Sequence, residues 1–271
     1  MATTTHSARP EAHRICNLVP SRDTEKDWRF EHALVAGAVA APAEALPVSV
    51  DLRAAWWTIG NQELTGSCVG WGSTDGVARY HFVKAGRLAP ATKLSPRFTW
   101  MASKETDTIT ARPETFIEEA GTTLKAAVDI LRKFGAVPES LLPFHIETTM
   151  YLGSENAFYA TAATRRIASY FNLQKNLGNW RSWLATQGPI LVGLNVDATW
   201  DNATATHGKL DAFQPGTVRG GHAPCVVGYT ADGRFIIRNS WGTNWGDNGF
   251  AYASEAYINA AFFNESYGVT L

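Results

Sequence analysis

The chain has 271 residues, which is enough for one large domain or two smaller ones with a substantial core. Hydrophobic residues make up 45% and aromatic residues 11% of the sequence, and this composition excludes a largely disordered protein. The formal net charge of −1 gives no indication of a nucleic-acid or anionic-membrane partner, and no apolar run approaches the roughly 20 residues of a membrane-spanning helix.

Residues 1–46 are predicted to form an extension with little regular structure, because they are rich in Ala, Thr, Pro and charged residues. We expect no secretory signal, since the first residues lack an apolar segment of that type. Residues 23–37 can form one helix. The apolar side of this helix would consist of Trp28, Phe30 and Leu34. The folded part is expected to begin with the strand-like residues 46–53.

The first long helix is predicted to begin at Ser67 and Cys68 and to end before Gly86. Ser67 is the expected N-cap, because a short polar side chain suits that position. Three glycines weaken this segment as an isolated helix, so we expect another part of the chain to pack closely against it. These glycines are Gly70, Gly72 and Gly76.

Two further helices are predicted in the first half of the chain. Residues 95–105 begin with Ser-Pro, which places Ser95 at the N-cap and the proline at the first helical position. Residues 122–135 have the apolar spacing of an amphipathic helix, with Gly135 as the C-terminal cap. The apolar face of this helix would consist of Leu124, Val128, Leu131 and Phe134.

From about residue 150 onwards, short apolar runs predict strands. The predicted strands cover residues 165–173, 188–196, 222–230, 234–240, 249–254 and 267–271. Asp232 and Gly233 indicate a hairpin turn between two of them, and a short helix is predicted at 179–187. A mainly helical part at about 60–150 and a strand-rich part at about 151–271 indicate an α+β chain with two lobes.

The three cysteines are Cys16, Cys68 and Cys225. Their odd number and wide spacing do not fit a disulfide framework, so we expect three free thiols and a reducing, cytoplasmic compartment. Cys225 is expected to be a small buried residue on a strand. No spacing typical of metal ligands occurs, and no metal or other cofactor is predicted.

Cys68 has the position of an activated thiol, because a helix N-terminus favours the thiolate and a nearby imidazolium would favour it further. Among the seven histidines, His222 stands out because it follows two glycines and opens a strong strand. Asn239 ends the next strand and has a side chain of the type that orients an imidazole. A simple hairpin register would place Asn239 near Val226, so contact with His222 requires a bulge, a longer turn or a strong twist.

Three segments resemble the signature blocks of the papain-like cysteine peptidases. They read NQELTGSC at 61–68, GGHAPCVVGY at 220–229 and FIIRNSWGTNWGDNGF at 235–250. The third block is the most specific of the three, and the likeness extends over about residues 46–271, with features of bacterial members. The resemblance implies an α+β fold with a helical lobe, a barrel-like β-rich lobe and an active-site cleft between them.

The resemblance also implies roles for individual residues. Cys68 would be the nucleophile, His222 the general base and then acid, and Asn239 the residue that orients the imidazole. Gln62 would donate its side-chain amide to the oxyanion, alongside the backbone N–H of Cys68. Trp241 would shield the contact between His222 and Asn239 from water. The implied substrate-binding residues are Gly121, Thr122, Gly193, Gly221 and Trp241.

Three positions depart from the family pattern and bear on substrate preference and on disulfide formation. Thr65 stands where a cysteine is usual, so the disulfide that the family forms there is not expected. Val69 replaces an aromatic residue after the nucleophile, and Thr122 replaces the second glycine of a pair. None of these changes removes a group that the implied chemistry requires.

The implied activity is hydrolysis of peptide or protein substrates through a thioester acyl-enzyme. The same acyl-enzyme also serves an exopeptidase, an amidase or a transpeptidase, and a non-catalytic binding protein on this fold is a further alternative. The extension 1–46 stands where the family carries a pro-segment that often lies along the cleft. Because it is short and lacks a clear helical-bundle pattern, we expect partial or no inhibition, with the segment packed on the surface of the folded part.

Overall fold

The computed structural model describes residues 14–41, 45–106, 120–145 and 153–271. Its helical elements are η1 (Thr24–Lys26), α1 (Phe30–Val35), α2 (Cys68–Gly70), the π-helical η2 (Trp71–Ala78), α3 (Arg79–Lys84), α4 (Pro96–Thr106), α5 (Leu124–Lys133), α6 (Glu155–Ala163), α7 (Leu177–Thr186), α8 (Ala198–Asp201), η4 (Pro215–Thr217) and α9 (Glu255–Ala261). Its strands are β1 (Val50–Asp51), β2 (Ser169–Asn172), β3 (Ile190–Val196), β4 (Lys209–Leu210), β5 (Gly220–His222), β6 (Cys225–Tyr229), β7 (Phe235–Arg238), β8 (Phe250–Ala253) and β9 (Phe262–Thr270).

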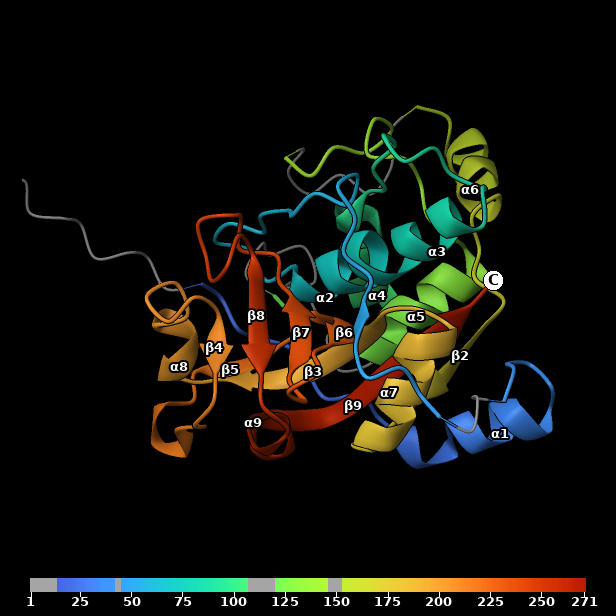
Figure 1. Ribbon diagram of the computed structural model, residues 1–271. Helices are drawn as coiled ribbons and strands as arrows, with labels where there is room; N and C mark the ends of the chain where they lie inside the picture. The colour runs from blue at the N-terminus through green and yellow to red at the C-terminus, as the bar shows by residue number, and fades with distance from the viewer. Residues whose placement is uncertain (1–13, 42–44, 107–119, 146–152) are drawn as a thin grey trace, which may run out of the picture.

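Helices and strands occupy two parts of the molecule. Figure 1 shows helices α2 to α6 gathered on one side, and the strands together with α7, α8 and α9 on the other. The predicted α+β class, with a helical and a strand-rich lobe, is therefore confirmed. Among the described residues, no helix combines the length and the apolar character that a membrane span requires.

The strands form one mixed sheet. Its main path is β2-β9-β3-β6-β7-β8-β4, with β1 paired to β6 and β5 paired to β3. The pair β4 and β8 is parallel, and the other pairs are antiparallel. Within the described residues the two ends of the path, β2 and β4, do not pair with each other, so the sheet is open. The predicted barrel-like lobe is therefore a strand-rich lobe with an unclosed sheet.

One continuous helical run extends from Cys68 to Lys84 through α2, η2 and α3. The predicted start of this helix is confirmed, but the predicted role of Ser67 is wrong. Ser67 occupies the N-cap position, yet its side chain caps no backbone N–H group. Its hydroxyl instead lies 2.6 Å from the hydroxyl of Thr65, which in turn donates to the carbonyl of Gln62 at 2.7 Å. The loop before the helix is therefore held by side chains that bond to one another.

Two glycines of η2 allow the sheet to approach this helical run. A methyl group on Gly72 would lie 2.5 Å from a backbone oxygen between β5 and β6, and one on Gly76 would lie 2.2 Å from Sγ of Cys225. The thiol of Cys225 donates to the carbonyl of Gly72 at 3.0 Å. The predicted close packing is therefore confirmed, and it sets β6 directly against the helix that begins at Cys68.

We expect Gly72→Ala to lower the free energy of unfolding by about 1–2 kcal/mol. A new methyl group forces apart two packed segments, which typically costs about 1–3 kcal/mol, and the better helix propensity of alanine recovers up to about 1 kcal/mol. Urea unfolding followed by tryptophan fluorescence measures the change. Gly216→Ala is the matched control, because a methyl group there meets no atom of the described residues within 4 Å. A Gly72→Ala protein as stable as the parent would contradict the close packing.

The two amphipathic helices of the first half follow the sequence closely. Ser95 caps α4, since its Oγ accepts from the backbone N–H of Phe98 at 3.1 Å, and Thr123 caps α5 in the same way. Gly135 follows α5 with a positive φ of 94°. The prediction for Phe134 is wrong, because its side chain is 43% exposed at the end of the helix instead of facing the core.

The hairpin between β6 and β7 contains the irregularity that the His222 and Asn239 spacing requires. Thr230 and Arg234 close its turn, with the backbone N–H of Thr230 donating to the carbonyl of Arg234 at 2.8 Å. The register shifts by one residue between Val226 and Gly228. Of the three alternatives that the sequence left open, the structure has the bulge, and β7 therefore carries Asn239 closer to the end of β5 than a regular hairpin would.

Several elements of the second half were not predicted. Strand β5 has only three residues and no apolar alternation. Helix α9 is followed without a loop by β9, which begins at Phe262. The predicted strand at 267–271 is the end of β9, which begins five residues earlier. Pairing with β3 and β2 on its two sides explains the length of β9.

The N-terminal extension is tied to the rest of the fold at Asp27. Its buried carboxylate accepts hydrogen bonds from Nδ2 of Asn172 at 3.1 Å and from the hydroxyl of Tyr267 at 2.7 Å. The other carboxylate oxygen pairs with Nζ of Lys125 at 2.5 Å. Because these partners belong to β2, β9 and α5, the extension is fixed to both parts of the molecule at this point.

A short helix follows this anchor. Helix α1 covers Phe30–Val35, so the predicted helix at 23–37 is much shorter than expected. Phe30 packs edge-on against Trp183 with 5.9 Å between the ring centroids, and Ala33 is fully buried. Trp28, which was predicted on the apolar side, is 64% exposed because it precedes the helix.

Candidate active site

Cys68 is the first residue of α2 and is fully buried. Burial raises the pKa of its thiol to about 12, which outweighs the opposing effect of the backbone N–H groups of Ala223 and Val69. A helix N-terminus favours the thiolate, but it does not compensate here for the loss of water around the sulfur. The thiol is therefore neutral at pH 7 in this state of the protein.

His222 and Asn239 are in direct contact. Nε2 of His222 and Oδ1 of Asn239 lie 2.7 Å apart, and Oδ1 also accepts from the backbone N–H of Ser240 at 2.8 Å. Because Oδ1 is an acceptor, Nε2 of the imidazole carries a proton. Nδ1 is buried and has no hydrogen-bond partner among the residues that the structure describes. This nitrogen is therefore the one left to accept a proton.

The imidazole of His222 contacts two tryptophan rings, which also contact each other. The ring of Trp241 is 4.9 Å away and tilted by 37°, and that of Trp200 is 5.5 Å away and perpendicular, measured between ring centroids. Burial lowers the pKa of His222 to about 4, although the hydrogen bond with Asn239 acts in the opposite direction. Trp241 occupies the predicted place beside the histidine, whereas the contact of Trp200 with the site was not predicted.

Gln62 is buried, and three hydrogen bonds fix its side-chain amide. Oε1 accepts from the hydroxyl of Ser240 at 2.9 Å, and Nε2 donates to the carbonyls of Thr65 at 3.0 Å and of Ile15 at 3.4 Å. Ser240 thus sets which end of the amide donates. Ser240 directly follows Asn239 in the third sequence block, and this position is the sequence signal that could have pointed to Ser240.

Residues 14–19, the cleft segment, run between the helical part and the sheet. The backbone N–H of Leu18 donates to the carbonyl of Gly221 at 3.0 Å, and that of Val19 donates to the carbonyl of Thr122 at 3.1 Å. Leu18 is only 5% exposed. The expectation that the extension packs on the surface is therefore wrong for these residues, which contact the site from both sides.

The glycines named from the family likeness all border the cleft segment. A methyl group on Gly121 would lie 1.9 Å from the carbonyl oxygen of Asn17, and one on Gly193 would lie 2.9 Å from a side-chain carbon of Leu18. A methyl group on Gly221 would be 3.1 Å from Cβ of Leu18. The structure thus brings Thr122 and the three glycines together along one strip that the chain's own residues occupy, whereas Trp241 lies outside this strip.

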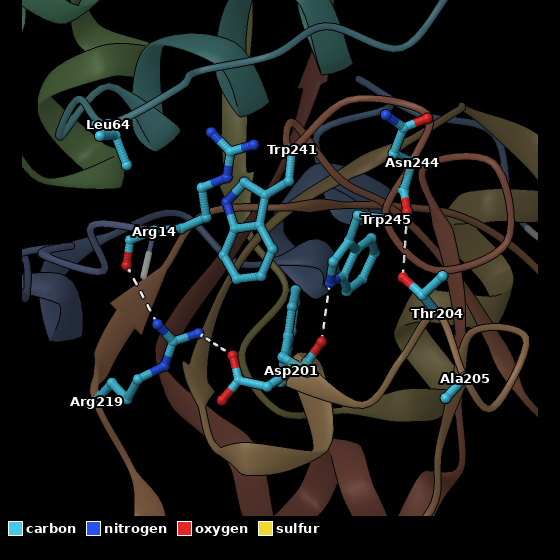
Figure 2. A pocket seen from close by; sticks show the side chains of 10 residues that line it. Arg14, Leu64, Asp201, Thr204, Ala205, Arg219, Trp241, Asn244 and Trp245 are labelled. Carbon is cyan, nitrogen blue, oxygen red and sulfur yellow. Dashed lines mark hydrogen bonds and ion pairs between the residues drawn. The ribbon is translucent and has the colours of Figure 1, made fainter. Parts of the chain in front are cut away.

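A pocket of about 690 Å³ lies next to Trp241, at the other end of the cleft segment from Leu18. Figure 2 shows Arg14, Arg219 and Asp201 along one side of it and Trp241 and Trp245 in its wall. Its lining residues are Arg14, Leu64, Trp200, Asp201, Thr204, Ala205, Arg219, Trp241, Asn244 and Trp245. The loop residues among them have no sequence pattern, which is why the pocket was not predicted.

A protein-family model described as papain family cysteine protease matches residues 46–267, which is most of the chain. The chain belongs to the papain family of cysteine proteases. The likeness read from the three sequence blocks is thereby confirmed. Among solved structures, xylellain, a cysteine protease from Xylella fastidiosa, superposes with a TM-score of 0.79 over 97% of this chain and 99% of that one, at 19% identity.

Two curated relatives from the papain family match at slightly higher sequence identity but over a smaller share of the chain. Cysteine proteinase 1 of Dictyostelium discoideum is 22% identical over 222 residues, which cover 77% of this chain and 61% of that protein. Cathepsin J of Mus musculus is 27% identical over 210 residues, which cover 73% and 57%. The chain thus spans about three fifths of the length of these two papain-family relatives.

Proposed function

We propose that this chain is a cysteine peptidase that hydrolyses peptide bonds through Cys68, His222, Asn239 and Gln62. Membership of the papain family supports this reading. The single observation that carries it is the 2.7 Å contact between Nε2 of His222 and Oδ1 of Asn239. That contact leaves Nδ1 of His222 to accept a proton, and the backbone N–H of the next residue, Ala223, acts on the Cys68 thiol at the helix N-terminus.

In the proposed first half-reaction, Nδ1 of His222 takes the proton of the Cys68 thiol. The thiolate attacks the substrate carbonyl carbon, and the electron pair of the C=O double bond moves to oxygen. Nε2 of Gln62 and the backbone N–H of Cys68 donate to that oxyanion. When the carbonyl re-forms, the C–N bond breaks, and the imidazolium gives its proton to the departing amine. A thioester between Cys68 and the acyl group remains.

In the proposed second half-reaction, water replaces the amine. His222 takes a proton from water as the hydroxyl oxygen attacks the thioester carbonyl, and the same donors bind the second oxyanion. The C–S bond then breaks, the sulfur takes back its proton from the imidazolium, and the carboxylic acid leaves. Asn239 keeps the imidazole oriented through both steps by holding Nε2–H.

We further propose that the cleft segment blocks this site. The carbonyl of Ile15 accepts from Nε2 of Gln62 at 3.4 Å, which is the donor that the oxyanion would use. Leu18 fills the space beside Gly193 and Gly221 that a substrate side chain would enter. A substrate must therefore displace residues 14–19 before it reaches Cys68.

The test is to trap the thioester. The protein is incubated with a peptide p-nitrophenyl ester, quenched in acid, and digested for mass spectrometry. We expect one acyl group on the fragment that contains Cys68, and we expect neutral hydroxylamine to remove it. An acyl group on another residue, or none in a protein that still hydrolyses peptides, would disprove the proposed mechanism.

We expect Gln62→Ala to lower kcat about 10²- to 10³-fold with a smaller change in KM, because the amide acts on charge that develops in the transition state. Steady-state kinetics on one peptide substrate measures both constants. Ser240→Ala should have a smaller effect in the same direction, since it loosens the amide without removing it. A Gln62→Ala enzyme within about twofold of the parent would assign the oxyanion donor to another group.

A further inference from the structure

Arg219 lines the pocket next to Trp241, and the proposed mechanism gives no role to its side chain. Its Nη2 pairs with the carboxylate of Asp201 at 2.7 Å, and its Nη1 donates to the backbone carbonyl of Arg14 at 3.4 Å (Figure 2). Its Nε is buried and has no hydrogen-bond partner in the part of the chain that the structure describes. The guanidinium thus binds a main-chain carbonyl that belongs to the cleft segment.

The position of Arg219 is fixed by the fold. Its backbone N–H donates to the carbonyl of Val196 at the end of β3, and the next residue begins β5, which ends at His222. Its partner Asp201 ends helix α8. The guanidinium is therefore held from two elements, with its side chain only 20% exposed.

The pocket adjoins the two tryptophan rings that contact the imidazole of His222. In the proposed mechanism His222 gives its proton to the leaving amine, so the leaving group has to pass the imidazole. Trp200 and Trp241, which pack against the imidazole, are also lining residues of the pocket. The strip of Thr122 and the glycines lies at the other end of the cleft segment.

We propose that Arg219 is a substrate-binding residue that donates to a main-chain carbonyl of the leaving peptide, within the first two residues after the scissile bond. This proposal rests on the proposed peptidase function. Because the charge of Arg219 is already balanced by Asp201, a neutral carbonyl suits it as well as a terminal carboxylate does. The substrate class is accordingly a peptide that continues past the cleaved bond and ends in either an amide or a carboxylate.

Three substrates with the same acyl peptide test the proposal on the full chain. The first carries aminomethylcoumarin as its leaving group, the second carries three further residues that end in an amide, and the third carries the same three residues with a free carboxylate. The readout is the ratio of kcat/KM for the second substrate to that for the first. Any cleft segment still bound lowers both values equally, so it cancels in the ratio.

We expect Arg219→Gln to lower this ratio about tenfold, mainly through KM of the extended peptide, because a hydrogen bond from a charged donor is lost. Arg219→Lys should recover part of it. Arg181→Gln is the matched control, since Arg181 forms a similarly exposed ion pair with Glu255 elsewhere on the surface, and its ratio should equal that of the parent. Asp201→Asn should favour the free carboxylate at least threefold over the amide, because it leaves the guanidinium charge uncompensated.

Two results would overturn the proposal while leaving the peptidase intact. One is turnover of all three substrates with a ratio that changes less than twofold in Arg219→Gln. The other is a parent enzyme that prefers the free carboxylate by tenfold or more, which would make it a carboxypeptidase. Failure of both the full chain and a protein that begins at Pro20 to turn over any of the three would instead overturn the proposed function, and the Arg219 proposal with it.

Discussion

Removal of residues 1–19 should raise the rate of peptide hydrolysis at least tenfold. These residues include the cleft segment, which reaches Gln62, Thr122 and Gly221 through its backbone and buries Leu18. A segment tethered to its own site acts at an effective concentration in the millimolar range, so it competes strongly with substrate. A tenfold rate increase corresponds to an apparent activation free energy that is lower by about 1.4 kcal/mol. The measurement is the initial rate of hydrolysis of one fluorogenic peptide.

Two truncated proteins, one that keeps the anchor at Asp27 and one that lacks it, separate inhibition by the cleft segment from loss of stability. A protein that begins at Arg14 keeps the whole cleft segment, so its rate of peptide hydrolysis should equal that of the full chain. Leu18→Asp in the full chain should reproduce part of the activation. A protein that begins at Leu46 also loses Asp27 and Phe30 from the core, so it should melt at a lower temperature than one that begins at Pro20. Equal activity of the full chain and the protein that begins at Pro20 would contradict inhibition by the segment.

The rate at which the free thiols are alkylated should also show whether the cleft segment has been displaced. With the cleft segment in place, burial raises the pKa of Cys68 to about 12 and lowers that of His222 to about 4. At pH 7, which is below the first value and above the second, both groups are uncharged and the thiol reacts slowly. Displacing the segment admits water, which favours the charged forms and should speed alkylation of Cys68 by iodoacetamide.

Cys68→Ala should abolish peptide hydrolysis, with a loss of roughly 10⁶-fold in kcat, as is typical when the nucleophile of such a catalytic unit is removed. The fold should persist, because alanine fits the space of a buried cysteine with little rearrangement. Circular dichroism and the melting temperature check this. Cys16→Ser is the matched control for loss of a thiol near the cleft and should leave hydrolysis within a few-fold of the parent. Substantial activity in a well-folded Cys68→Ala protein would remove the basis of the whole account.

The sequence predicted those parts of the fold that local physics decides. The caps at Ser95 and Gly135 and the turn at Asp232 and Gly233 follow from residues with narrow conformational preferences, and the structure has them where expected. Exposed Phe134 shows the limit of this reasoning. Periodicity places it on the apolar face, but the helix ends just before it, so its side chain leaves the core.

Contacts between distant segments depend on register, which sequence spacing does not specify. The contact of His222 with Asn239 needs the one-residue shift between Val226 and Gly228, and no residue pattern there distinguishes a bulge from a regular ladder. The path of the cleft segment is equally impossible to predict from the sequence. Its hydrogen bonds are made by backbone groups, which every sequence carries, so its composition gives no signal of where it lies.

The pocket residues show a third limit. Arg219 and Asp201 lie 18 residues apart in sequence and meet only because β5 pairs with the end of β3, beside helix α8. Trp200 reaches His222 from the same helix. Neither pair has a spacing that indicates contact, so the pocket beside His222 became visible only in three dimensions.

Labelling with an irreversible thiol-directed peptidyl inhibitor shows whether Cys68 is the nucleophile and whether His222 activates it. The protein that begins at Pro20 is incubated with a peptidyl vinyl sulfone at pH 7, digested, and mapped by mass spectrometry, with His222→Ala in parallel. We expect one adduct per molecule, on Cys68, with Cys225 unmodified and with labelling strongly slowed in His222→Ala. Labelling of Cys68 at the same rate with and without the imidazole, or no faster than labelling of Cys225, would contradict these roles.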